Sequence, residues 1–381
     1  MGDRLRAMAR NGRSRRSDAS CVSPVRWGLA LRVGGALRPP SSLCETLLAF
    51  PLRLKGRRVA CALRAPQMNP SRIASCVVYT ALLAAASLSA QINTMQTLAP
   101  GVYFHEGDPR QGHSNGGWVV LDDYVLVIDA NYPSGAKIVL PKIKESTDRP
   151  IKLVFDTHQH ADHAYGNQVY VDAGAVPIAH VGALEGMKQA ETGYYGGTPG
   201  AWENWAKKRP DVAASKLKPP SLLFPKDMFI DDGHQRVELR YFGVAHTHGD
   251  AMAWLPKEKI LFTGDTCVNS ASNNLNDADT AEWIKTLDAV KALGAVRVCP
   301  GHGPIGGPEI IVDQQRYLIE LRQMVQALVA ARKSPVQVKA ALPDVAAGLR
   351  KIPNIARYIP ANLTAHVQKV FREMGGEALP Q

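Results

Sequence analysis

The alternation of apolar and polar positions from residue 102 onward predicts short β-strands with helices between them. Two apolar runs, 118–121 and 124–129, flank the acidic pair Asp122 and Asp123, which is typical of a β-hairpin. Residues 134–146 follow, with Ser134 as a capping residue and apolar positions at helical spacing, and predict an amphipathic helix. Six further apolar runs are typical of strands, at residues 151–155, 176–180, 237–242, 253–255, 260–262 and 296–298.

Helical periodicity dominates the last part of the chain. A helix is predicted between the last two strands, and helices are also predicted from about 308 to 328 and over 361–374. Residues 167–170 begin a further helix-like stretch, whereas residues 185–232 are less regular. Strands that alternate with helices in this way predict a layered α/β domain with the helices on the outside.

The first ninety residues differ from this pattern. Residues 1–67 are rich in Arg, Pro, Ser and Ala and have no sustained period of a helix or a strand. Residues 68–90 have a short basic start with Arg72, an apolar run and a small residue, Ala90, at the end, which is typical of a cleaved signal peptide. We therefore expect Met68 to be the true start, and residues 1–67 to be a basic extension that is non-native or disordered.

Charge and cysteine content agree with export. Residues 1–90 hold 15 Lys and Arg against 3 Asp and Glu, a net charge of +12. Because the whole chain carries +11, residues 91–381 carry 11 − 12 = −1. A near-neutral mature protein argues against a nucleic-acid partner. Only Cys267 and Cys299 lie in this part, too few for a disulfide framework, and each is expected to be a small buried residue. We expect a periplasmic or secreted protein that has no stable membrane anchor once the signal is removed.

The residues with the clearest chemistry are histidines and aspartates that follow predicted strands. Residues 157–163 read Thr-His-Gln-His-Ala-Asp-His, directly after the strand 151–155. Three more loops carry His246, Asp265 and His302, each close to a glycine. Imidazole nitrogen and carboxylate oxygen are ligands that zinc prefers, and glycine allows the tight turns that bring ligands together. The ordered set of four loops therefore predicts a metal site.

In their order, these four loops resemble the motifs of the metallo-β-lactamase superfamily: a His-x-His-x-Asp-His loop, a later His, a Gly-Asp bridging position and a final Gly-His-Gly. The resemblance covers roughly residues 98–310. It implies an αβ/βα sandwich over 91–310 with a dinuclear zinc site at one edge, and leaves 311–381 as a helical C-terminal extension packed on it. By this resemblance, the first of two zinc ions per chain is held by His158, His160 and His246. The second is held by Asp162, His163 and His302, and Asp265 bridges both.

Hydrolysis is the chemistry that the resemblance implies. A hydroxide shared by two zinc ions is a nucleophile near neutral pH, because the metals lower the pKa of bound water. Asp162 can orient this hydroxide and is the catalytic residue that we predict. We expect an exported hydrolase that opens a carbonyl bond of a small-molecule ester, thioester or cyclic amide. The expected activity is most like that of a β-lactamase, which would link the protein to antibiotic resistance.

Candidate substrate-binding residues lie in three places. Residues 273–283 are similar to the Asn-Leu-x-Asp-Ala-Asp-then-Trp segment of the metallo-β-lactamases that use a Cys ligand, which makes Asn274 a candidate. The aspartates of this segment can equally cap the helix that follows. His248 lies beside a ligand loop, and Tyr195 and Trp202 belong to an aromatic segment that is either a lid over the metals or a packed insertion.

Three positions depart from the β-lactamases with a Cys ligand. Asp265 stands in place of the Cys, His163 in place of an Arg, and Val268 in place of a Lys that takes the substrate carboxylate. This ligand set looks more like that of lactonases and glyoxalase-II-like thioesterases, which are the alternative. Persulfide dioxygenase-type iron chemistry stays open on motif alone. A non-catalytic zinc-binding accessory protein is the remote alternative.

Overall fold

The computed structural model describes residues 92–192 and 200–380, which belong to the second of two compact units, Met68–Gln381. Three of the sequence expectations lie outside the described residues: the basic extension 1–67, the signal-like segment 68–90 and Tyr195.

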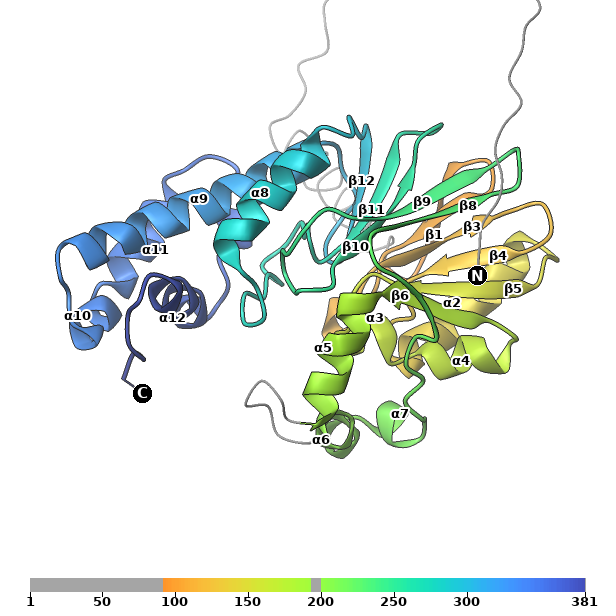
Figure 1. The fold of residues 1–381 in the computed structure, drawn as a ribbon, viewed down its shortest axis with the longest axis horizontal. Helices are drawn as coiled ribbons and strands as arrows, with labels where there is room; N and C mark the ends of the chain where they lie inside the picture. Colours follow the sequence, from red (N-terminus) through yellow and green to blue (C-terminus); the bar gives the residue numbers. More distant parts are fainter. Residues whose placement is uncertain (1–91, 193–199, 381) are drawn as a thin grey trace, which may run out of the picture. The chain divides into compact units, whose positions relative to one another are not determined.

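Two β-sheets form the centre of the fold (Figure 1). The first has seven strands in chain order, antiparallel from β1 to β4 and parallel from β4 to β7. Its strands are β1 Met95–Ala99, β2 Val102–His105, β3 Gly116–Val120, β4 Val125–Ile128, β5 Ile151–Asp156, β6 Val176–His180 and β7 Leu222–Phe224. The second sheet has the order β12-β11-β10-β9-β8, and only its β11–β12 pair is parallel. Its strands are β8 Asp227–Asp231, β9 Arg236–Tyr241, β10 Ala251–Leu255, β11 Ile260–Gly264 and β12 Arg297–Pro300.

Helices lie outside the two sheets, as expected for a layered α/β domain. Those before the second sheet are α2 Pro133–Ser146, α3 Ala161–Ala164, α4 Asn167–Asp172, α5 Val181–Thr192, α6 Ala201–Lys208 and α7 Pro210–Ala213. Those after β11 are α8 Thr280–Lys291, α9 Glu309–Ala330, α10 Pro335–Ala340, α11 Leu342–Arg350 and α12 Leu363–Glu373. Two short 3-10 helices, η1 Pro109–Gln111 and η2 Ala356–Tyr358, complete the described elements.

Strand β4 illustrates how the layers are filled. Its Val125 and Val127 pack in a buried cluster with residues of α2. Its Leu126 and Ile128 belong to a second cluster, which they share with Leu239 and other residues of the second sheet. Successive side chains of a strand point to opposite faces, so β4 contributes to a helix–sheet core and to a sheet–sheet core at once. The αβ/βα sandwich predicted from the sequence is confirmed.

The start of α2 differs from the prediction. The helix begins at Pro133, and Ser134 is inside its first turn rather than at the cap. Proline suits this first position because its missing N–H would have no partner there in any case. Ser134 donates its N–H and its hydroxyl to the carboxylate of Asp211, at 3.1 and 2.6 Å. The side chain that caps the helix therefore comes from α7, which is remote in sequence.

Residues 185–232 contain more structure than their pattern indicated. Helices α5, α6 and α7 and strands β7 and β8 all lie wholly or partly in this range. β7 has only three residues and pairs with β6, and β8 pairs with β9. Elements this short depend on their neighbours rather than on their own periodicity, which is why the sequence did not predict them.

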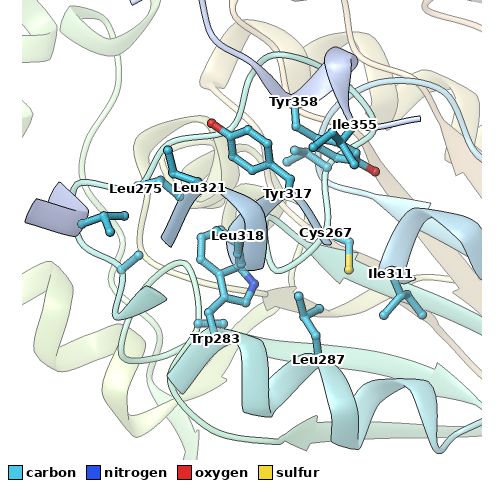
Figure 2. Close-up of a cluster of buried hydrophobic side chains, with 14 of the residues drawn as sticks. Cys267, Leu275, Trp283, Leu287, Ile311, Tyr317, Leu318, Leu321, Ile355 and Tyr358 are labelled. Carbon is cyan, nitrogen blue, oxygen red and sulfur yellow. The ribbon is translucent and has the colours of Figure 1, made fainter. Parts of the chain in front are cut away.

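The C-terminal helices share a hydrophobic core with the second sheet. Figure 2 shows Trp283 of α8 next to Leu318 and Leu321 of α9, with Tyr358 of η2 and the buried Cys267 close by. Cys299 is buried in the sheet–sheet cluster, so both cysteines have the small buried role that was expected. None of the helices in the described part of the chain is long and apolar enough to cross a membrane.

Candidate metal centre

The predicted ligands lie at one edge of the sandwich, just after the strands that carry them. β9, β11 and β12 run in the same direction, so the segments that leave their carboxyl ends meet at one edge. Asp265 directly follows β11, and His302 follows β12 by two residues. A Cβ atom on Gly301 would lie 2.0 Å from Oδ1 of Asp265, so only glycine allows this close approach of the two loops.

The first group of ligands consists of three histidines. Donor atoms of His158, His160 and His246 all lie within 4.8 Å of one another. The closest pair is Nε2 of His246 and Nδ1 of His160, 2.9 Å apart. His158 and His246 are buried, whereas His160 faces a cavity. We call these residues the three-histidine group.

The second group is mixed and lies beside the first. Donor atoms of Asp162, His163 and His302 also lie within 4.8 Å of one another, and we call them the mixed group. Asp265 lies between the two groups. Its Oδ1 is 3.3 Å from Nε2 of His163, and its Oδ2 is 3.5 Å from Nε2 of His302 and 3.6 Å from Nε2 of His246. The structure thus brings all seven predicted ligands together.

Orphaned polar atoms show that these side chains fit a metal. Nε2 of His158, Nε2 of His163 and Oδ1 of Asp265 are buried, and no described residue forms a hydrogen bond with any of them. A buried polar atom without a partner costs about 1–3 kcal/mol. A cation at the centre of each group would be a partner for these lone pairs, and a set of imidazole and carboxylate donors suits zinc.

Three of the ligand histidines at this edge are oriented from behind. His163 donates Nδ1–H to Oδ2 of Asp129 at 2.9 Å, and His246 donates Nδ1–H to the carbonyl of Asn274 at 2.8 Å. His160 is turned the other way, since its Nε2 lies 2.8 Å from Oδ2 of Asp277. The nitrogen that remains in each ring faces the ligand cluster. Partners of this kind hold a ligand in its tautomer and orientation.

Of these partners, sequence reasoning missed Asp129 and gave Asn274 and Asp277 only other roles. Asp129 follows β4 with a left-handed φ of 62° and also accepts a hydrogen bond from the N–H of Thr157 at 2.9 Å. The hydroxyl oxygen of Thr157 in turn lies 3.1 Å from Nδ1 of His158. Asp277 was considered only as a helix cap, and that role belongs to Asp279, which accepts from the N–H groups of Ala281 and Glu282. The one indication in the sequence that Asp129 could support a ligand was its position directly after the strand β4, next to the strand that carries the ligand loop.

The electrostatics of His158, His246 and Asp162 suit the binding of a metal. Burial lowers the pKa of His158 well below its ordinary value and that of His246 to about 4, so both are neutral near pH 7. Burial alone would raise the pKa of Asp162, but the adjacent His163 and the hydrogen bond from His302 outweigh burial and lower it to about 2. Neutral imidazole and ionised carboxylate are the states that bind metal.

Two adjoining cavities open beside the ligands. The first, the metal cavity, has a volume of about 610 Å³ and is lined by His160, Asp162, Asp265 and His302. The second, the side cavity, has a volume of about 480 Å³. His160, Ala161 and Trp205 line both cavities, so the two adjoin at these residues. Volumes of this size are typical of sites for small molecules.

The candidate substrate-binding residues take different places. Asn274 lines the metal cavity, and its Oδ1 accepts a hydrogen bond from the N–H of Asn276 at 2.9 Å. His248 lines the side cavity. Trp202 packs on Tyr165, with ring centroids 4.6 Å apart, and is not among the residues that line either cavity. Its neighbour Trp205, which the sequence did not single out as a site residue, lines both.

A comparison with known protein families identifies the superfamily. Residues 109–302, about half of the chain, match the family model of the metallo-beta-lactamase superfamily. The chain therefore belongs to this superfamily.

Among its relatives is a "Metallo-beta-lactamase type 2" of Bacteroides fragilis, 38% identical over 109 residues, a stretch that covers 26% of this chain and 43% of the relative. The chain thus spans less than half of that relative. A protein of the same name from Bacillus cereus is 26% identical over 200 residues, 51% of this chain and 68% of the relative. The solved structure of DIM-1 metallo-beta-lactamase is 20% identical with a TM-score of 0.47, over 59% of this chain and 96% of that chain.

Proposed function

We propose that the protein is a zinc-dependent hydrolase that opens a carbonyl bond, with a cyclic amide of the β-lactam type as the first candidate substrate. The observation that carries this proposal is the pair of ligand groups joined by Asp265, beside a cavity large enough for a small molecule. A structural metal site is closed, whereas a catalytic one leaves room for water and substrate.

The metals would be held by the seven predicted ligands, three in each group and Asp265 between them. Two zinc ions bound there would supply Lewis acidity toward a carbonyl oxygen and lower the pKa of water. Asp162 lines the metal cavity, and its low pKa keeps the carboxylate ionised. In this proposal Asp162 accepts a hydrogen bond from the attacking water and thereby orients it toward the substrate carbonyl.

The choice of a β-lactam rests on similarity to relatives that are named metallo-beta-lactamase type 2. A lactone or a thioester is the second candidate. It is favoured by the ligand set, with Asp265 and His163 where the Cys-ligand β-lactamases have Cys and Arg. It is also favoured by Val268, which is buried in the core where those enzymes have a lysine for the substrate carboxylate.

We further propose that the mature form is 91–381 and that it is exported, on the pattern of residues 68–90. In this form 91–310 make up the catalytic domain, and 311–381 are the extension that packs on it. The mass of the mature N-terminus, measured on protein from the periplasm or the medium, tests the proposal. A protein that keeps residues 68–90 and stays in the cytoplasm would contradict it.

The experiment that tests the activity is a screen of the mature form with a chromogenic cephalosporin, a homoserine lactone and a thioester, together with metal analysis. Turnover of the cephalosporin supports the first candidate, and turnover of the lactone or thioester alone supports the second. A fully metal-loaded protein that turns over none of them refutes the hydrolase.

The variant Asp162→Asn tests the role of the carboxylate, with Asp344→Asn on the surface of α11 as a matched control. We expect a loss of kcat of at least about 100-fold for the first and none for the second, since correctly placed proton acceptors contribute about that much. Metal content is measured on both, because Asp162 is also a predicted ligand. Unchanged kcat in Asp162→Asn would refute the assigned role.

A further inference from the structure

The C-terminal extension is connected to the loop 273–280, which supports the three-histidine group. At the start of this loop, Nε2 of Gln314 in α9 donates to Oδ1 of Asn273 at 3.0 Å. At its end, the N–H of Thr280 donates to Oε1 of Glu373 in α12 at 3.0 Å. Arg322 of α9 donates to the hydroxyl of Thr280 at 2.6 Å and to Glu373 at 2.7 Å. Helices α9 and α12 thus hold both ends of a loop that borders both cavities.

α12 also brings a positive charge to the side cavity. Lys369 lies on this helix, one turn before Glu373, and lines the side cavity together with Asp277, Glu185 and His248. Among the described residues that line the two cavities, Lys369 is the one lysine, and none is an arginine. Its side chain is 26% exposed, so it is partly withdrawn from solvent.

The acidic residues around Lys369 are each engaged with other groups. Asp277 lies 2.8 Å from His160, and Glu185 lies 3.1 Å from Lys188. Glu373 accepts from Arg322 and from Thr280.

Within the described residues, Lys369 forms one ion pair, and it is a long one. Its Nζ is 3.7 Å from Oε1 of Glu373, beyond hydrogen-bond distance, and it donates no hydrogen bond within the described part of the chain. An ammonium group has three N–H donors, and in this arrangement they are available to a ligand in the side cavity.

We propose that Lys369 binds an anionic group of the substrate, a carboxylate, in the side cavity while the scissile carbonyl lies in the metal cavity. This inference rests on the proposed hydrolase function and specifies its substrate class. The two cavities share His160 and Trp205 in their linings, and the substrate in this proposal spans both. Val268 is buried and cannot supply the cation. In this protein the C-terminal extension supplies it instead.

The test uses pairs of substrates of similar size, in which one member carries a carboxylate and the other is neutral at that position. One pair is a chromogenic cephalosporin and its methyl ester, and the other is the succinyl and butyryl thioesters of N-acetylcysteamine. Kinetics are measured on the mature, zinc-loaded protein and on the variants Lys369→Met and Lys369→Arg. Lys333→Met is the control, since Lys333 is exposed in the same C-terminal extension and lines neither cavity.

We expect Lys369→Met to raise KM for the anionic member of the active pair roughly fivefold, with kcat unchanged, as the loss of one partly exposed ion pair predicts. KM for the neutral member stays the same. Lys369→Arg keeps most of the preference, and Lys333→Met keeps all of it. A change in KM for one member alone is not a result of general destabilisation.

Equal KM values for the charged and neutral members in the unmodified protein would overturn the role of Lys369 and leave the hydrolase standing. An unchanged preference in Lys369→Met would do the same. Turnover of the homoserine lactone alone would also leave the hydrolase standing and overturn the role of Lys369, since this lactone has no carboxylate. If the zinc-loaded protein turns over neither the lactone nor any member of either pair, the hydrolase itself is refuted, and the role of Lys369 is refuted with it.

Discussion

The two ligand groups of the metal centre are supported by different parts of the molecule. His163 of the mixed group donates to Asp129, which directly follows the central strand β4. His160 and His246 of the three-histidine group depend instead on the loop 273–280, through Asp277 and a backbone carbonyl. That loop is held at both ends by α9 and α12. His163 of the mixed group is therefore oriented from the sheet, whereas two of the three histidines of the other group are oriented from a loop that the C-terminal extension holds.

The largest effect is expected at Asp129. Its carboxylate accepts from Nδ1 of His163 and from the N–H of Thr157, and Asp129→Ala leaves both buried donors without a partner. We expect about 100-fold weaker binding of the metal that the mixed group holds. We also expect a loss of about 2 kcal/mol in the free energy of unfolding. Chelator competition and urea unfolding measure the two effects. Asp123→Ala, in the exposed turn after β3, is the control and leaves both unchanged.

An Asp129→Ala protein that binds both metals with wild-type affinity would contradict the view that this half of the site is oriented from β4.

The next effect is a loss of stability in acid that originates in the C-terminal extension. His366 of α12 is buried beside Tyr317 of α9, and burial lowers its pKa from 6.5 to about 4. The unfolded chain takes up a proton near pH 6.5 while the folded protein does not. The stability that His366 contributes is therefore complete above pH 6.5 and is lost as the pH falls toward 4.

Between pH 7 and pH 5, we expect the wild type to lose about 2 kcal/mol more stability than His366→Gln, since one pKa unit corresponds to about 1.4 kcal/mol. Urea unfolding at the two pH values measures the difference. Parallel losses in the two proteins would show that His366 is not the group responsible.

Asp277 tests the three-histidine group directly. Its side chain is 52% exposed, so water can replace part of what is lost in Asp277→Ala. We expect about tenfold weaker binding of one metal, the lower end of the range for such partners. Asp277→Asn keeps an oxygen acceptor for His160 and is expected to retain most of the affinity. Equal losses in the two variants would indicate that the negative charge, rather than the hydrogen bond, is what matters.

The smallest effect is expected at Glu373, which acts on the site only through the loop 273–280. Glu373→Gln keeps one oxygen for the N–H of Thr280 but weakens the charged contact with Arg322. We expect about threefold weaker metal binding by the three-histidine group and no change in the mixed group. A threefold change corresponds to a loss of less than about 1 kcal/mol in binding free energy, the usual contribution of such an ion pair. Glu320→Gln on α9 is the matched control. A larger effect on the mixed group would remove the distinction between the two halves.

The ligands could be predicted from the sequence because each is marked locally. His158, His160, Asp162 and His163 occur within six residues after one apolar strand, and Asp265 and His302 lie beside glycines after others. Such spacing is visible without knowledge of the fold. Strands β3 to β6 and β9 to β12 were predicted to within a few residues, since apolar runs bounded by turn residues report burial directly.

The residues that support the ligands could not be predicted in the same way. Asp277 lies 117 positions from His160, and nothing in the sequence around it distinguishes a partner of histidine from a helix cap. Asp211 was not connected with α2 for the same reason. Trp205 lines both cavities while Trp202 packs on Tyr165, a difference set by which face of α6 meets the protein.

By itself, the sequence determined the kind of fold, the family motifs and the set of seven candidate ligands, because hydrophobic periodicity and ligand spacing are local properties of the chain. Only the tertiary structure decided what surrounds them: Asp129 behind His163, Asp277 behind His160, and a lysine of the last helix in the side cavity. These contacts join residues far apart in the chain, and their distances depend on how the sheets and helices pack, which no local pattern records.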